Sequence, residues 1–219
     1  MNIKADTVNP SLIGIITSPE KQFNYIKEQK IIWKPMITII IMVIMGNWLT
    51  SLGVDNFKNS EVQEEVELFF KIYQYISIVL SGIFVPIFSV LLSSFIHWVI
   101  AKITRSKVSF KQLFSMNTYI TFITALGILV NGLYYFYFSD GTGEMFTSMG
   151  SIVESNGAFG EIFNSIELFA IWTLILTGIG LHKVAEFPKW LAWAVPMCSF
   201  MLGVITTIIG ASFTEMVGV

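Results

Sequence analysis

Apolar residues gather in five long runs along the chain, and charged residues lie between the runs. Stretches without Asp, Glu, Lys or Arg cover 35–54, 72–101, 112–139, 168–182 and 190–214. A hydrocarbon core of roughly 30 Å needs about 20 helical residues to cross it. The run 168–182 is shorter than this, and it reaches that length if its helix begins at Ile162 and includes Glu167. None of the runs alternates as a membrane-spanning strand does.

The pattern therefore predicts an all-α integral membrane protein with a bundle of five transmembrane helices. The expected spans are about 35–54, 72–101, 112–139, 162–182 and 190–214, within a membrane domain of residues 35–214. Residues 1–34 form a separate N-terminal segment on the cytoplasmic side.

The basic residues give the bundle an orientation. If the N-terminus is cytoplasmic, the cytoplasmic pieces are 1–34, 102–111 and 182–189, and they hold 11 of the 13 Lys and Arg residues. The other side then holds 11 of the 15 acidic residues. Cytoplasmic loops of membrane proteins carry an excess of Lys and Arg. We therefore expect a cytoplasmic N-terminus and an extracytoplasmic C-terminus.

Two short helices are expected before the first span. Asn9-Pro10 and Ser18-Pro19 each place a capping residue before a proline, which suits the first position of a helix. In the second helix Phe23 and Ile26 share one side, and lysines are free to meet anionic headgroups. This pattern favours interfacial helices on the inner membrane surface. A cytoplasmic helix that packs on the bundle is the alternative.

A polar cluster is expected at the cytoplasmic end of the second, third and fourth spans. His97 precedes Lys102 by five residues and Asn117 follows Lys111 by six, so the two polar side chains lie at similar depth. An unmatched polar group in hydrocarbon costs several kcal/mol. We therefore predict that four residues bond to one another there: Ser93, His97, Asn117 and His182. An interhelical hydrogen bond, and not catalysis, is the expected role of Ser93 and His97, because no orienting acid accompanies them.

Glu167 is the candidate membrane carboxylate, because the length of the fourth span draws it toward the bilayer. Ionisable groups inside a membrane are candidates for function. A position in the first turn of its helix, where the dipole favours an anion, is the alternative. Four residues form a candidate loop for a partner or for lipid headgroups: Lys102, Arg105, Lys107 and Lys111.

Composition agrees with a membrane solvent. Only 13% of the 219 residues are charged, against about 25% in soluble domains. The small-residue spacings Ser77-xxx-Ser81, Ser89-xxx-Ser93 and Gly203-xxx-Thr207 allow close helix approach. The single Cys198 cannot form an internal disulfide. We expect no catalytic residues, no metal site, no cofactor and no nucleic-acid partner.

Three stretches of the chain carry a resemblance to a known family. They are Ile16-Thr17-Ser18-Pro19 with Phe23 and Tyr25-Ile26, then Ser94 through His97 and Ile103 to Phe114 and Tyr119, and Trp172 through Gly178-Ile179-Gly180-Leu181 to Lys189-Trp190. In these stretches the chain resembles the Yip (Ypt-interacting protein) domain family, in its bacterial branch. The acidic N-terminal region of the eukaryotic branch is absent, which disfavours a GTPase partner.

The resemblance implies a function without enzymatic activity. It implies a multi-pass protein of the bacterial cytoplasmic membrane that acts as an accessory or scaffold for other membrane proteins. Some bacterial members accompany ABC-type exporters, so such a transporter is a candidate partner, and a homo-oligomer is left open. The alternative is a small transporter or channel, which a water-filled midplane cavity containing Glu167 would favour. A dry core with polar residues only at its ends would favour the scaffold.

Overall fold

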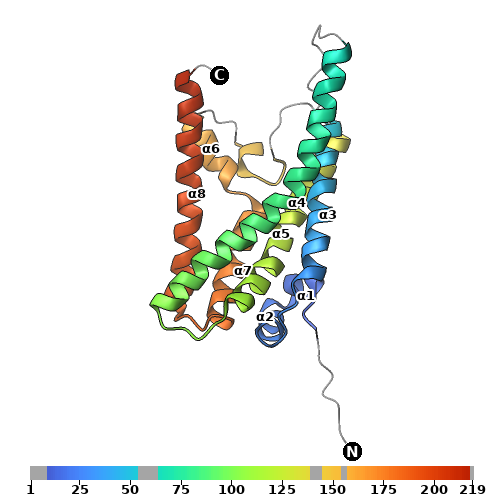
Figure 1. The fold of residues 1–219 in the computed structure, drawn as a ribbon. Coiled ribbons are helices and arrows are strands. Elements are labelled where there is room, and N and C mark those ends of the chain that lie inside the picture. The colour runs from blue at the N-terminus through green and yellow to red at the C-terminus, as the bar shows by residue number, and fades with distance from the viewer. Residues whose placement is uncertain (1–8, 54–63, 139–144, 154–156, 218–219) are drawn as a thin grey trace, which may run out of the picture.

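Helices account for most of the chain in the computed structural model, which describes residues 9–53, 64–138, 145–153 and 157–217 (Figure 1). Within these ranges there is no strand, and one isolated β-bridge joins Ser148 to Glu167. The elements are α1 (Leu12–Thr17), α2 (Pro19–Glu28), α3 (Trp33–Gly53), α4 (Glu64–Ile103), α5 (Phe110–Phe138), a 3-10 turn η1 (Met149–Ser151), α6 (Gly157–Ser165), α7 (Leu168–Lys183) and α8 (Lys189–Val217).

Four of the described helices, α3, α4, α5 and α8, are long and apolar enough to cross a membrane. They occupy the first, second, third and fifth apolar runs of the sequence. α4 is the longest, with 40 residues, and it contains Pro86. The helix α7 has 16 residues and is about 24 Å long, which is less than a typical hydrocarbon core.

The expected continuous helix from Ile162 to His182 is wrong. α6 ends at Ser165 and α7 begins at Leu168, so the chain breaks where the extension would have run. The backbone at Glu167 is extended, and its side chain caps α7 by accepting a hydrogen bond from the Ala170 amide at 2.7 Å. A carboxylate at this position stabilises a helix start through its orphan amide groups and its dipole.

The centre of the fold is α5, which packs against α3, α4 and α7, and against α1 and α2 near its first turns. Most of its length is buried, whereas α4 and α8 keep most of their surface exposed. Among the described helices, α8 has more than marginal contact only with α7 and α6. Figure 1 shows α8 standing apart from α3 and from the upper part of α4.

Glycines bring α3 and α5 together backbone to backbone. A Cβ atom on Gly132 would lie 2.3 Å from the Gly46 carbonyl oxygen, and one on Gly53 would lie 2.2 Å from the Tyr135 carbonyl oxygen. Neither position accepts a larger residue without separating the helices. Of the small-residue spacings that the sequence offers, the one at Gly203 faces open space, because a Cβ atom there would have no described atom within 4 Å. The tight crossing of α3 and α5 therefore uses glycines that lie outside the expected spacings.

The N-terminal helices begin differently from each other. α2 begins at Pro19 with Ser18 as its cap, as the Ser18-Pro19 pattern predicts. The other expected start, Asn9-Pro10, is wrong. α1 begins at Leu12, and Ser11 caps it by accepting from the Gly14 amide at 3.3 Å.

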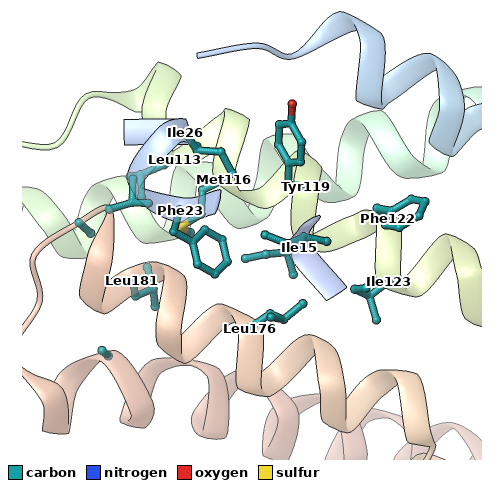
Figure 2. Close-up of a cluster of buried hydrophobic side chains, with 14 of the residues drawn as sticks. Ile15, Phe23, Ile26, Leu113, Met116, Tyr119, Phe122, Ile123, Leu176 and Leu181 are labelled. Atoms are coloured by element: carbon teal, nitrogen blue, oxygen red, sulfur yellow. The ribbon is translucent and has the colours of Figure 1, made fainter. Parts of the chain in front are cut away.

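The apolar side of α2 faces the protein and not lipid. Phe23 and Ile26 are fully buried, and they lie with Leu113, Met116 and Leu181 in the cluster drawn in Figure 2. The expectation that the apolar side of α2 is free to enter the membrane, as in an interfacial helix, is therefore wrong. The alternative of a helix packed on the bundle describes α2 better.

Polar contacts fix this docking at the surface. Lys27 of α2 pairs with Glu186 in the segment between α7 and α8, and Lys183 lies 3.0 Å from Glu20. The side chain of Gln112 donates to the Lys27 carbonyl at 2.9 Å. The hydrogen bond and charge of Lys27 hold the pKa of Glu186 below its usual value. The N-terminal helices are thus part of the folded core.

We predict that Phe23→Ala lowers the free energy of unfolding in mixed micelles by about 3–5 kcal/mol, the usual cost of emptying a buried phenylalanine site. Ile13→Ala is the control, because Ile13 is 73% exposed on the neighbouring helix and should change stability little. Deletion of residues 1–30 should unfold the bundle for the same reason. Equal small losses in both point variants would contradict the docking.

Candidate functional site

A groove of about 750 Å³ lies between α4, α5, α7 and α8, with two residues of α3 at one side. Its wall is a mixture of apolar side chains with hydroxyl and amide groups. The largest polar contribution comes from α5, through Asn117, Thr121, Thr124 and Asn131. The groove therefore runs along helices that are mostly apolar. Its polar lining is the main exception to their apolar composition.

The polar residues of α5 form a regular stripe. Asn117, Thr124 and Asn131 follow one another at intervals of seven residues, which places them on one face about 10.5 Å apart. Thr124 is exposed although it stands at the midpoint of this mostly buried helix, because its side faces the groove. Its hydroxyl lies 3.3 Å from that of Thr173 on α7.

Asn117 forms the first polar centre, near the N-terminal end of α5. Its side-chain nitrogen donates to Ser94 Oγ at 2.9 Å and lies 3.2 Å from His97 Nδ1. Ser94 Oγ in turn donates to the Val90 carbonyl at 2.5 Å. With the amide nitrogen facing His97, Nδ1 accepts and the ring is neutral. All three side chains are buried, so the contact joins α4 to α5 inside the bundle.

The structure brings together two of the four residues expected in this cluster, His97 and Asn117. Ser93 lines the groove and forms no hydrogen bond with the described chain, and Ser94 takes its expected role. His182 does not join, because its Nδ1 lies 2.8 Å from the Phe187 carbonyl oxygen at the end of its own helix. Ser94 and His97 are three residues apart, a spacing that also shares a helix face, and this spacing is the signal that could have identified Ser94.

The second polar centre lies at the opposite end of the groove and contains Glu167. Asn131 Nδ2 donates to Thr147 Oγ1 at 2.8 Å, and that hydroxyl lies 2.6 Å from Glu167 Oε1. Backbone bonds hold Thr147 in place, since the Leu168 amide donates to the Thr147 carbonyl at 3.1 Å. No pattern in the sequence points to Thr147, because it precedes Glu167 by 20 residues in an irregular segment.

Glu167 takes the second of the positions considered for it, at the start of its helix. It caps α7, as the alternative of a helix-start carboxylate anticipates, and it also lines the groove. One of its oxygens accepts from the Ala170 amide and the other from the Thr147 hydroxyl. No basic residue pairs with it among the described ion pairs.

The basic loop residues lie away from the groove. Lys102, Arg105, Lys107 and Lys111 are exposed, and the Lys102 ammonium lies 5.3 Å from the centre of the Trp98 ring. Ser106 between them donates to the Ala185 carbonyl at 2.6 Å. This contact ties the segment between α4 and α5 to the segment between α7 and α8 and leaves the lysines facing outward.

These features define an all-helical membrane protein with a polar-lined groove between its long apolar helices. The chain belongs to the Yip1 domain family, whose family model matches residues 13–210. It is 29% identical over 219 residues to the membrane protein YknW of Bacillus subtilis (strain 168), across 97% of this chain and 94% of that protein. No solved structure matches the chain.

The first polar centre gives a test with neighbouring serines. We predict that Ser94→Ala destabilises the protein in mixed micelles by about 0.6 kcal/mol, and by no more than about 1.7 kcal/mol, the range for interhelical bonds in membranes. Ser93→Ala should change stability much less, because no described residue bonds to it. His97→Leu and Asn117→Leu should together cost less than the sum of the single changes. Strict additivity would rule out the contact.

Proposed function

We propose that this protein is a five-span accessory protein of the bacterial cytoplasmic membrane, with its N-terminus inside and its C-terminus outside. The distribution of Lys and Arg supports this orientation. α7 supplies the fourth of the five crossings, because at about 24 Å it is only slightly short of the core and α6 precedes it directly. Local thinning of the bilayer accommodates a short span at modest cost.

Cysteine labelling tests this topology. In a Cys198→Ser background we predict that Lys107→Cys reacts with an impermeant maleimide only after the inner face is opened. Ile152→Cys should react in intact cells, since its side chain is 83% exposed in the segment between α5 and α6. Reaction of both from outside would contradict the five-span arrangement.

We infer that the accessory role is binding of another membrane protein without catalysis. The observation that carries this inference is the small-residue face of α8. A Cβ atom added to Gly203 or Gly210 would have no atom of the described residues within 4 Å, and Thr207 lies between them on the same face. Helix interfaces in membranes are enriched in such residues, because they let backbones approach closely. Within the chain, Gly46 and Gly132 already use this kind of contact.

A partner that spans the membrane suits this face better than a soluble one. α8 packs on α6 and α7, and its remaining surface is apolar along most of its length. An ABC-type exporter is our candidate partner, on the strength of the family resemblance. The exposed basic segment 102–111 would then meet the partner's cytoplasmic surface or anionic headgroups.

We predict that Gly203→Leu reduces recovery of crosslinked membrane partners from native membranes by about tenfold, the effect of 1.4 kcal/mol. A Cβ atom at this position would meet no described atom within 4 Å, and leucine has a higher helix propensity than glycine, so the fold should persist. Met201→Leu, at a 54% exposed position of the same helix, is the matched control. If Gly203→Leu leaves the recovery of every partner unchanged, α8 is not part of the interface.

A small transporter or channel is the second candidate. Glu167 lines one end of the groove and His97 the other, and hydroxyl groups lie between them. A polar-lined groove that includes Glu167 supports this candidate. The transporter requires that this groove be filled with water at the midplane, whereas a dry core would favour the scaffold.

A further inference from the structure

Four polar side chains face the groove without a hydrogen bond to any residue that the structure describes. They are Asn47 on α3, Ser89 and Ser93 on α4, and Ser199 on α8, all within helices that can cross a membrane. A polar group left without a partner in hydrocarbon costs several kcal/mol. Packing alone therefore does not complete the groove, and water or a polar ligand must meet these groups.

The charge of the groove selects the ligand. Among the residues that line it, Glu167 is the only one with a formal charge at neutral pH, since His97 accepts a hydrogen bond on Nδ1. A carboxylate offers about four acceptor positions. Thr147 and Ala170 use two of those of Glu167. The remaining positions suit an ammonium group, which donates charge-assisted hydrogen bonds.

The volume and the apolar lining of the groove indicate the rest of the ligand. Its volume of about 750 Å³ lies in the range of ligand pockets, roughly 300–1,000 Å³. Leu92, Ile96 and Phe200 give the lining an apolar side, and Leu92 and Ile96 are 61% and 43% exposed at its rim. An apolar chain can therefore lie against them and enter from the surrounding bilayer.

The position of Glu167 orients such a molecule. It stands at the start of α7, at the same end as the C-terminal part of α5, which is the outer face in the proposed topology. Leu92 and Ile96 lie deeper, on the side of His97. A ligand with its polar head at Glu167 and its apolar tail toward His97 would have the same orientation as a lipid in the outer leaflet.

We propose that the groove binds an amphiphile with an ammonium head and an apolar chain, with the head on Glu167. The binding site requires the membrane placement proposed above and is independent of any partner on α8. A lipid with an amine headgroup and a free long-chain amine share this chemistry.

Photocrosslinking tests the site with a defined probe. The full-length protein in phosphatidylglycerol nanodiscs is irradiated with dodecylamine that carries a diazirine, and the crosslinked residues are mapped by mass spectrometry. We expect crosslinks on the groove faces of α4, α5 and α8, which excess dodecylamine suppresses. Dodecanol, with the same chain and no charge, should compete at least about tenfold more weakly, since the charged contact is worth that factor or more.

Two variants separate the site from a general effect on folding. Glu167→Gln should reduce groove crosslinks about tenfold. Ser89→Phe leaves the cap of α7 intact and places a ring in the groove, so it should reduce them as well. Leu91→Phe is the control, at a 42% exposed position of α4 that does not line the groove, and it should leave them unchanged.

Added lipid identifies the source of the amine. Competition by phosphatidylethanolamine would assign the site to a lipid headgroup, and competition by dodecylamine alone would assign it to a free amine. Both results support the proposal. Equal competition by dodecanol, together with unchanged crosslinking in Glu167→Gln and Ser89→Phe, would overturn it.

Discussion

A polar group that enters the hydrocarbon core must find a partner there, and the rest of this fold depends on how α5 meets that requirement. Asn117 binds Ser94 and contacts His97 on α4, while Asn131 binds Thr147, which holds Glu167 at the start of α7. These two centres set the positions of the neighbouring helices relative to α5. The stripe between them, around Thr124, has no comparable packing partner among the described residues, and the groove forms along it.

The side of α5 that faces α3 packs by close backbone contact. Gly132 and Gly46 allow its backbone to touch α3, where dispersion replaces hydrogen bonds as the source of stability. Near its first turns Leu113 and Met116 receive Phe23 of α2, so the N-terminal helices close the same end of the bundle that the basic segments surround. α8 lies outside this arrangement, and a Cβ atom on Gly203 or Gly210 would meet no described atom within 4 Å. We propose that this small-residue face binds a second protein and that the groove has a separate function.

Much of the fold could be predicted because hydropathy and helix length are local properties. The long helices begin and end close to the apolar runs, and the Ser18-Pro19 pattern marks the start of α2. The break before Glu167 could not be predicted, since its cap depends on the Ala170 amide and on Thr147. The expected depth of His97 and Asn117 in the membrane correctly predicted that they lie side by side. Depth does not determine how α4 is rotated about its axis, and this rotation brings Ser94 and not Ser93 to Asn117. Burial of Phe23 against Gly180 depends on tertiary packing, which an amphipathic pattern does not distinguish from lipid contact.

We infer that the polar stripe of α5 faces a hydrated groove and not the bilayer. Thr124 and Ala125 are adjacent at the middle of the helix, and the first is exposed while the second is fully buried. The direct measurement is the reaction rate of cysteine at each position with a small hydrophilic methanethiosulfonate, in a Cys198→Ser background. We predict rapid reaction at Thr124→Cys and very slow reaction at Ala125→Cys. If Thr124→Cys resists this reagent but reacts with a lipid-soluble maleimide, the stripe faces hydrocarbon and no hydrated groove lies along α5.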